Sequence, residues 1–386
     1  MKKVTLKIVI ALAALLLCSS CGVKGSNKAE PKDDGQSIAS VDDSVPTEAP
    51  EIIFAKNLLA GMSIEEKTAQ MFIARCPETG AAELVASTQP GGYILFGRDF
   101  KEKTRQQITG NIASYQAAAT IPMFIGVDEE GGYVNRVSRN PQLRAEPFLS
   151  PSELYEKGGL ELIVSDAKEK CELLRSLGIN LNFAPVCDIS TDEDDFMYTR
   201  SLGQDAKITS EYISAVVTEM NANSIGSVLK HFPGYGSNGD THEGIIHDKR
   251  DYDSIKQVDF LPFSAGIKAG ASAVLVSHNI VESIDKVSPA SLSLEAHNIL
   301  RDELGFDGVV VTDDLSMGAI VDYVDAAGAA VAAVEAGNDL LCCTDYETQL
   351  AAVISAVESG RISVERIDES TLRILLLKIK LGIITM

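Results

Sequence analysis

The chain has 386 residues, 45% of them hydrophobic and 23% charged, which is typical of a globular protein with one large core or two ordinary ones. Its formal net charge is −21, whereas nucleic-acid binding requires a basic face for the phosphates. We therefore expect no nucleic-acid partner and interpret the acidic surface as a source of solubility.

The first twenty residues have the layout of a signal peptide. Three lysines precede an apolar run over residues 8–17, which is too short to cross a hydrocarbon layer of about 30 Å as a helix. The stretch "LCSSCG" that follows resembles a bacterial lipoprotein processing site, although Cys18 stands where leucine is usual. This resemblance implies a signal peptide over 1–20, lipidation at Cys21, and an extracytoplasmic protein anchored to the cell membrane. Ordinary secretion with a free Cys21 is the alternative.

Residues 21–50 are polar, rich in Asp, Ser and Pro, and almost free of large apolar side chains. Such a segment cannot offset its ordering entropy, so we expect a disordered acidic tether leading to a folded domain over residues 51–386. The folded domain carries five cysteines, an odd number without a C-x-x-C pair. We therefore expect neither a disulfide framework nor a zinc site.

The folded domain alternates apolar runs with amphipathic stretches. Residues 207–222 and 291–304 are amphipathic, and Ser63 lies three residues before Glu66 in a capping box that predicts a helix over 62–72. The apolar runs, almost continuous like parallel strands covered on both faces, are residues 91–97, 123–128, 181–186, 227–232, 272–278, 308–314 and 338–343. Repeated βα units predict a single (β/α)₈ barrel of the TIM type, with a doubly wound sheet as the alternative. The position of the eighth strand stays open.

Polar side chains gather at the ends of five of these runs, where barrel active sites are built. They are Asp128, Glu129, Glu130, Asp188, Lys230, His231, His278, Asp313 and Asp314. The convergence predicts one site at the carboxyl ends of the strands. No phosphate-binding glycine motif occurs in a strand context, so we expect no nucleotide and no other cofactor.

The stretch "VVVTDDLSM" over residues 309–317 ends its strand in two carboxylates. Because side chains alternate along a strand, Asp313 shares a face with Val309 and Val311, whereas Asp314 points the other way. A carboxylate at a strand end can act as a nucleophile, a metal ligand or the cap of the next helix. The pattern alone leaves these three roles open.

The stretch "KHFPGYGSNGDTH" over residues 230–242 places two of the five histidines on a glycine-rich loop. His242 lies two residues after Asp240, and a neighbouring carboxylate stabilises an imidazolium and fixes its tautomer. Such a pair can donate a proton to a leaving group and later accept one from water. A polar loop that merely faces solvent is the alternative.

Lys230 and His231 end a buried apolar run, where an unpaired charge is costly. A polar partner is therefore expected nearby, and a ligand with hydroxyl groups would supply one. Arg136 and Arg200 can add planar donors to the same ligand. The absence of tryptophan favours a small pocket for a terminal sugar over a long aromatic platform.

Six ordered motifs together resemble glycoside hydrolase family 3 and, within it, the bacterial β-N-acetylglucosaminidase branch. They are "DEEGGYVNR" (128–136), "FAPVCDI" (183–189), "TRSLG" (199–203), "KHFPGYG" (230–236), "DTH" (240–242) and "GFDGVVVTDDLSMGAI" (305–320). The resemblance runs from about residue 55 to 380. It implies that Asp313 is the catalytic nucleophile, that His242 is the general acid/base and that Asp240 is its partner. The residues implied to hold the sugar are Asp128, Arg136, Arg200, Lys230 and His231.

Two positions depart from the family pattern, since histidine is common where Tyr235 stands and arginine where Tyr133 stands. Family members with β-glucosidase activity take their acid/base carboxylate from a second domain, for which we expect no room after the barrel. The implied function is that of a monomeric, metal-free retaining exo-β-N-acetylglucosaminidase. Its implied substrate is a β-GlcNAc-containing glycan or muropeptide. The alternatives are a phosphorylase, a β-glucosidase and a catalytically silent surface sugar-binding lipoprotein.

Overall fold

The fold is described for residues 48–386 in a computed structural model of the chain. The predicted signal peptide, the lipidation site at Cys21 and nearly all of the predicted tether lie outside the described residues. Within residues 48–386, every helix is too short or too polar to cross a membrane.

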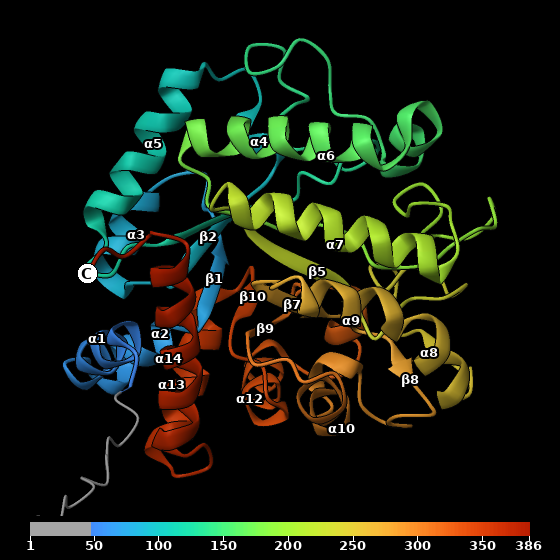
Figure 1. Cartoon of the computed structure of the whole chain (residues 1–386). Helices are drawn as coiled ribbons and strands as arrows, with labels where there is room; N and C mark the ends of the chain where they lie inside the picture. Colours follow the sequence, from blue (N-terminus) through green and yellow to red (C-terminus); the bar gives the residue numbers. More distant parts are fainter. Residues whose placement is uncertain (1–47) are drawn as a thin grey trace, which may run out of the picture. The chain divides into compact units, whose positions relative to one another are not determined.

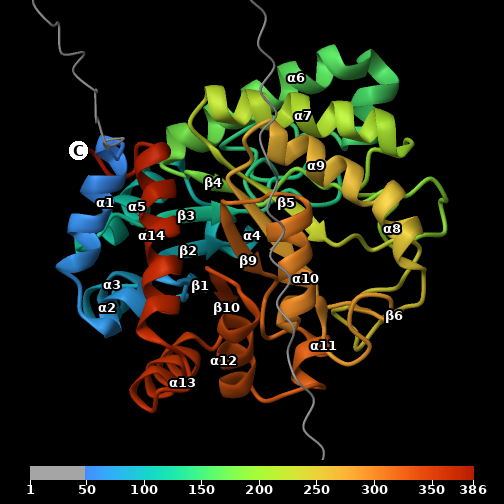
Figure 2. The same cartoon turned by 60° about the horizontal axis from the view of Figure 1, so that its bottom comes forward.

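Eight short parallel strands form the centre of the fold, and helices cover their outer side (Figure 1, Figure 2). The strands are β1 (Phe72–Arg75), β2 (Gly92–Leu95), β3 (Phe124–Val127), β4 (Leu181–Asn182), β5 (Gly226–Phe232), β7 (Ala273–Val276), β9 (Val309–Thr312) and β10 (Leu341–Cys343). Their order in the sheet is β10-β1-β2-β3-β4-β5-β7-β9. Almost all of their residues are buried, because the core lies on one face and the helices lie on the other.

The sheet closes on itself between β9 and β10. Val311 of β9 forms a parallel bridge with Leu340, and the Thr312 amide donates to the Leu340 carbonyl oxygen at 3.1 Å. The Thr312 hydroxyl also accepts a hydrogen bond from the Cys342 amide at 3.0 Å. Closure confirms the predicted (β/α)₈ barrel and excludes a doubly wound sheet, which would leave two open edges.

The strand that the sequence did not locate is β1. The predicted capping box is present, because the Ser63 hydroxyl accepts from the Glu66 amide at 3.2 Å and the Glu66 carboxylate accepts from the Ser63 amide at 2.8 Å. Helix α2 (Ile64–Gln70) begins there as predicted, but it ends before residue 72, where β1 begins. A four-residue strand that directly follows a helix is too short for its hydrophobic pattern to be distinguished from that of the helix.

The predicted strand over 181–186 is also shorter than expected. Only Leu181–Asn182 pair as β4, since Pro185 has no amide hydrogen to donate to a neighbouring strand. The helix expected over 207–222 is confirmed as α7 (Ala206–Ala222).

The amphipathic stretch over 291–304 is not one helix. The Ser293 hydroxyl accepts from the Ala296 amide at 3.4 Å, which caps a new helix start inside the stretch. The result is a 3₁₀ turn, a short α-helix and a π-helical turn, namely η1 (Ala290–Leu292), α10 (Leu294–Asn298) and η2 (Ile299–Glu303).

The remaining helices follow the strands in chain order (Figure 1). They are α3 (Ala81–Thr88), α4 (Gly97–Phe100), α5 (Arg105–Ala118), α6 (Pro151–Leu177), α8 (Tyr252–Val258), α9 (Phe260–Lys268), α11 (Gly318–Val321), α12 (Ala326–Ala336) and α13 (Tyr346–Glu358). Two short strands, β6 (His247–Asp248) and β8 (Ile280–Val281), pair outside the barrel.

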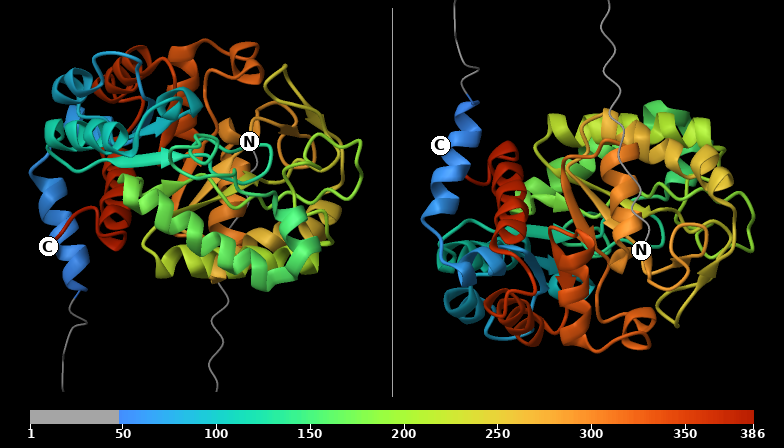
Figure 3. Two further views of the ribbon diagram at one scale, coloured as in Figure 1. Left: turned by 90° about the horizontal axis from the view of Figure 1, so that it is seen from above. Right: turned by 90° about the horizontal axis from the view of Figure 1, so that it is seen from below.

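The first helix, α1 (Pro50–Ala60), packs along the last helix, α14 (Val364–Lys380), as both views of Figure 3 show. Ala55, Leu375 and Ile384 form a small apolar cluster between them. The described chain therefore starts and ends side by side.

The five cysteines of the described residues, Cys76, Cys171, Cys187, Cys342 and Cys343, are buried and free. Burial raises the pKa of Cys342 and Cys343 well above the ordinary value, so both thiols stay protonated near pH 7.

Candidate active site

A cavity of about 610 Å³ opens at the carboxyl ends of the barrel strands. It is lined by all eight residues to which the sequence gives catalytic or sugar-binding roles, although the roles themselves stay predictions. These residues are Asp128, Arg136, Arg200, Lys230, His231, Asp240, His242 and Asp313. Within residues 48–386, no three His, Cys, Asp or Glu side chains are grouped so that they could hold a metal ion.

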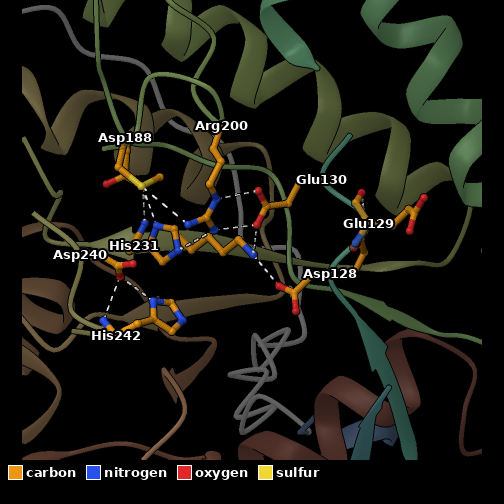
Figure 4. A network of polar contacts seen from close by, with 11 residues as sticks. Asp128, Glu129, Glu130, Asp188, Arg200, His231, Asp240 and His242 are labelled. Carbon is orange, nitrogen blue, oxygen red and sulfur yellow. Dashed lines mark hydrogen bonds and ion pairs between the residues drawn. The ribbon is translucent and has the colours of Figure 1, made fainter. Parts of the chain in front are cut away.

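Four charged side chains form a network on one wall of the cavity (Figure 4). Arg200 donates to Glu130 through Nε–Oε2 and Nη2–Oε1 contacts of 3.0 and 2.8 Å. Lys230 Nζ lies 2.6 Å from Glu130 Oε1 and 2.6 Å from Asp128 Oδ1. Burial alone would raise the pKa of Glu130, but Arg200 and Lys230 hold it well below its ordinary value. Burial alone would lower the pKa of Lys230, but Asp128 and Glu130 raise it. Glu130 and Lys230 are therefore both charged near pH 7.

A second carboxylate, Asp188, holds His231 in place (Figure 4). Asp188 Oδ2 accepts from His231 Nδ1 at 2.7 Å and from the His231 amide at 3.0 Å, while Oδ1 accepts from the Tyr235 amide at 2.8 Å. The carboxylate fixes the proton on Nδ1, so His231 Nε2 can accept from Arg200 Nη2 at 3.2 Å. The sequence placed Asp188 at a strand end but gave it no partner.

The end of β5 explains how the adjacent residues Lys230 and His231 both line the cavity. The pairing register between β5 and β7 shifts over residues 229–232, which breaks the strict alternation of the strand. Both polar side chains then point to the same side, where their carboxylate partners lie.

The turn after β5 has room only for glycine at two positions. Gly234 and Gly236 have φ values of +117° and +55°, in the region that favours glycine. A Cβ at Gly236 would lie 2.5 Å from Arg250 Cζ, and one at Gly234 would lie 2.3 Å from Asp259 Oδ1. Arg250 and Asp259 are themselves paired at 2.8 Å, so this ion pair sets the path of the chain into the next loop.

Asp240 and His242 lie on the loop over residues 237–246, which we call the acid/base loop, and their side chains contact each other (Figure 4). His242 Nδ1 lies 2.6 Å from Asp240 Oδ1, which also accepts from the His242 amide at 2.9 Å. The contact places the proton on Nδ1 and leaves Nε2 free to donate or accept another. The His242 side chain is 61% exposed, so this part of the site is open to solvent.

Of the two carboxylates that follow β9, one is used by the fold and the other is free. Asp314 Oδ1 accepts from the Ser316 amide and Oδ2 from the Thr344 hydroxyl, both at 2.9 Å. Asp313 Oδ1 accepts from the Asp314 amide at 2.9 Å, and its Oδ2 has no hydrogen-bond partner within the described part of the chain. Because β9 ends at Thr312, alternation no longer applies and both carboxylates line the cavity. Neither carboxylate caps the next helix, because α11 (Gly318–Val321) begins after Met317 without a side-chain cap. Asp314 instead stabilises the turn after β9, and Asp313 Oδ2 is left free for chemistry.

Asp313 is held in its ionised form. Burial alone would raise the pKa of Asp313, but the imidazoles of His278 and His231 and the Asp314 amide bring it below its ordinary value. His278 lies between the Ser291 hydroxyl at 2.7 Å and the Asp314 carbonyl oxygen at 3.0 Å. Burial lowers the pKa of His278, so this imidazole is neutral near pH 7. The hydrogen bond from the Asp314 amide stabilises the Asp313 carboxylate whatever the charge of His278.

Arg136 is placed by a loop that folds around Glu129. The buried Glu129 carboxylate accepts from the amides of Arg136 and Val137 at 2.7 Å and from the Ser138 amide at 3.0 Å. These backbone donors supply the stabilisation that a buried carboxylate otherwise takes from a cation. Arg136 Nε is buried and has no hydrogen-bond partner among residues 48–386.

Arg75 is a cavity residue that the sequence missed, because β1, which it ends, was not located. Its Cζ lies 4.7 Å from the centre of the Phe96 ring, and its Nε is buried without a hydrogen-bond partner in the described chain. Two arginines, Arg75 and Arg136, thus line the cavity, and each has a buried Nε without a hydrogen-bond partner within residues 48–386.

The two positions that depart from the family pattern lie in different surroundings. Tyr133 is 72% exposed at the edge of the cavity, whereas Tyr235 is 2% exposed beneath it.

Comparison with known proteins agrees with the fold and the motifs. A family model described as "Glycosyl hydrolase family 3 N terminal domain" matches residues 63–377. The β-hexosaminidase LpqI of Mycobacterium tuberculosis is 31% identical over 386 residues, with 97% of each chain covered. β-Hexosaminidase A of Pseudoalteromonas piscicida is 30% identical over 328 residues, which cover 78% of this chain and 55% of that protein. This chain therefore spans about half the length of that relative.

Among solved structures, a glycoside hydrolase family 3 β-N-acetylglucosaminidase from a Paenibacillus species superposes with a TM-score of 0.78 at 32% identity. The match covers 84% of this chain and 65% of the Paenibacillus chain. The chain belongs to glycoside hydrolase family 3.

Proposed function

We propose that this protein is a retaining exo-β-N-acetylglucosaminidase that hydrolyses terminal β-linked GlcNAc from cell-wall fragments or other glycans. The observation that carries the proposal is the lining of one cavity by a free carboxylate, Asp313, and by the Asp240–His242 pair. The relatives named above are β-hexosaminidases, which supports an amino sugar as the substrate.

The first step forms a covalent sugar–enzyme ester. An Asp313 carboxylate oxygen attacks the anomeric carbon while the bond from that carbon to the glycosidic oxygen breaks. His242, protonated at both ring nitrogens, gives its Nε2 proton to the departing oxygen, so the aglycone leaves as a neutral alcohol. Asp240 stabilises the imidazolium before this transfer through its 2.6 Å contact with Nδ1.

The second step releases the sugar. Neutral His242 accepts a proton from water at Nε2 while the water oxygen attacks the anomeric carbon. The ester bond to Asp313 breaks, the carboxylate is restored, and the sugar leaves with its original anomeric configuration. Two inversions at the same carbon therefore give net retention.

The Asp128, Glu130, Arg200 and Lys230 network supplies fixed charges to hydrogen-bond the sugar hydroxyls, together with His231. Because these groups are already paired, they need little reorganisation when the sugar binds. Their placement on one wall of the cavity supports a single terminal sugar as the bound unit.

The proposal is tested with p-nitrophenyl glycosides of β-GlcNAc and β-glucose. We expect faster turnover of the GlcNAc substrate, and turnover of neither, or faster turnover of the glucoside, contradicts the proposal. Tight GlcNAc binding without turnover would instead identify a sugar-binding protein. A slow fluorinated substrate should add mass to the peptide that contains Asp313, and labelling of another carboxylate would refute the nucleophile assignment.

A second candidate is phosphorolysis, in which phosphate replaces water in the second step. Two observations favour it. The proposed acid/base is an imidazole, which does not repel an anion, and the positively charged side chains of Arg75 and Arg136 line the cavity. Reactions with and without inorganic phosphate separate the two candidates. Formation of the sugar 1-phosphate supports phosphorolysis, and an unchanged yield of free sugar supports hydrolysis.

We also propose that a lipid on Cys21 anchors the protein, as a monomer, outside the cytoplasm. The "LCSSCG" stretch supports this location. Metabolic labelling with an alkyne fatty acid should mark the wild-type protein and leave Cys21→Ser unlabelled in the soluble fraction. Equal membrane association of both forms would contradict the anchor, and size-exclusion chromatography tests the monomer.

A further inference from the structure

Tyr235 connects the sugar-binding wall to the acid/base loop. Its amide donates to Asp188 Oδ1 at 2.8 Å, and its ring packs edge-on against the His231 ring with centroids 5.1 Å apart. Its hydroxyl lies 2.5 Å from the Thr241 hydroxyl oxygen. Tyr235 is 2% exposed and Thr241 is fully buried, so water does not compete for this contact.

Thr241 is the residue between Asp240 and His242, and it anchors the acid/base loop on two sides. Its hydroxyl meets Tyr235, and its carbonyl oxygen accepts from the Ala319 amide of α11 at 3.2 Å. Helix α11 follows the strand that carries Asp313. The loop is therefore fixed between the sugar-binding wall and the element beside the nucleophile.

The His242 side chain has little other support. It is 61% exposed, and Asp240 is its one side-chain hydrogen-bond partner within residues 48–386. Because Asp240 belongs to the same loop, this contact orients the imidazole within the loop but cannot place the loop over the cavity. The Thr241 anchor supplies that placement.

We infer that Tyr235 is a positioning residue for the acid/base, holding Thr241 so that His242 reaches the departing glycosidic oxygen. The inference rests on the proposed function of His242. Tyr235 occupies a position at which the family commonly has histidine, so this chain has its own form of the contact. Burial raises the pKa of Tyr235 above its ordinary value, and the hydroxyl therefore stays neutral over the working pH range.

The test compares leaving groups, because only a poor leaving group needs a proton. For a β-GlcNAc alkyl glycoside or disaccharide, Tyr235→Phe should lower kcat/KM about 10- to 100-fold, since a misplaced catalytic group costs factors of this size. For the 2,4-dinitrophenyl glycoside, kcat/KM should change less than about 2-fold. The kcat for this second substrate should still fall, together with KM, because release of the sugar needs His242 as the base.

Three further variants control the experiment. Thr241→Val removes the other half of the contact and should give the same pattern, while Thr241→Ser keeps a hydroxyl and should retain most activity on both substrates. Tyr93→Phe removes a buried hydroxyl that donates to the Ala81 carbonyl oxygen at 2.8 Å, away from the cavity, and should change neither substrate's rate. If the contact acts as a unit, Tyr235→Phe and Thr241→Val are not additive in the double variant.

The kinetic results separate failure of the inference on Tyr235 from failure of the proposed function. Equal losses on both substrates assign Tyr235 to sugar binding through His231 and overturn the inference. No loss for Tyr235→Phe or Thr241→Val, with a leaving-group-dependent loss for His242→Ala, also overturns it but leaves the proposed function intact. An inactive wild-type protein, or a His242→Ala variant without leaving-group dependence, overturns the proposed function itself.

Discussion

Two buried lysines occupy very different surroundings. Lys230, at the mouth of the barrel, lies 2.6 Å from each of two carboxylates, and these raise its pKa against the effect of burial. Lys378, on α14, is fully buried, and the one hydrogen bond of its Nζ within the described chain is to Gln70 Oε1 at 2.7 Å. Its Nζ also lies 5.1 Å from the centre of the Phe124 ring. Burial lowers the pKa of Lys378 to about 7.

The comparison shows that burial by itself does not decide whether a lysine carries charge. At the mouth of the barrel, the carboxylates of Asp128 and Glu130 keep Lys230 charged, and a charged side chain there can bind a polar ligand. Behind the barrel wall, residues 48–386 place no carboxylate in contact with Lys378, so its ammonium form costs stability. The two regions should therefore respond in opposite ways to the same substitution.

The largest effect is expected on kcat, when Asp313 at the mouth of the barrel is replaced. Asp313→Asn should lower kcat by at least about 10³-fold, because a neutral amide cannot form the ester intermediate. Asp314→Asn is the matched control, since an amide oxygen can still accept from the Ser316 amide, and it should lose less than about 10-fold. Steady-state kinetics with p-nitrophenyl β-GlcNAc measure both, and equal losses would contradict the separate roles of the two carboxylates.

Lys230→Met should lower the free energy of unfolding by about 3 kcal/mol, since the partly buried Asp128 would lose its cation and the buried Glu130 would keep Arg200 alone. Urea unfolding at pH 7 measures the change. Lys256→Met, which breaks an exposed pair with Glu303, should change stability by less than about 1 kcal/mol. A small loss for Lys230→Met would mean that the network is not needed for folding.

Lys378→Met should instead stabilise the protein by about 2–4 kcal/mol at pH 7. The folded pKa of about 7 lies below the unfolded value of 10.5, so between these values only the unfolded chain binds the proton. The wild-type protein therefore loses stability as the pH falls from about 10.5 to 7, by up to about 1.4 kcal/mol per pH unit. In Lys378→Met, Gln70 loses its hydrogen-bond partner, which offsets part of the stabilisation.

Urea unfolding of wild type and Lys378→Met at several pH values between 7 and 10.5 checks this slope. Lys380→Met, two residues further on the same helix but exposed, should keep the wild-type slope. Parallel curves for wild type and Lys378→Met would show that Lys378 is charged in the folded protein.

The smallest effect is expected for Arg75→Met. Because the Arg75 Nε has no hydrogen-bond partner in the described part of the chain and only the contact with the Phe96 ring is lost, the substitution should lower stability by no more than about 1 kcal/mol. It should raise KM about 3- to 10-fold with kcat within about 2-fold, since a donor to bound substrate is lost. An unchanged KM would show that Arg75 faces the cavity without contacting the sugar.

Much of the fold could be predicted because its strands are covered on both faces and are therefore continuously apolar. The strand β1 could not, since three apolar residues and an arginine directly after a capped helix are too few to show the two-residue alternation of a strand. Lys378 could not be found either, because a lysine on an amphipathic helix normally reaches solvent, and its burial depends on packing between distant segments.

In the site, too, the sequence identified individual residues but not the contacts between them. Asp313, His242 and Lys230 could be selected because each stands at a strand end or in a motif. Glu130 and Asp188 were visible as strand-end acids. That Glu130 pairs with Lys230 and Arg200, and Asp188 with His231, depends on how neighbouring strands are brought together. The Tyr235–Thr241 contact left no sequence signal, because a tyrosine in a glycine-rich turn can equally face solvent.

The seam between β9 and β10 is closed in part by a side chain, the hydroxyl of Thr312, and Thr312 directly precedes Asp313. One short segment thus both closes the barrel and carries the carboxylate that we propose as the nucleophile. Opening of the seam would therefore displace Asp313 as well, so a barrel that has not closed would lack a correctly placed nucleophile.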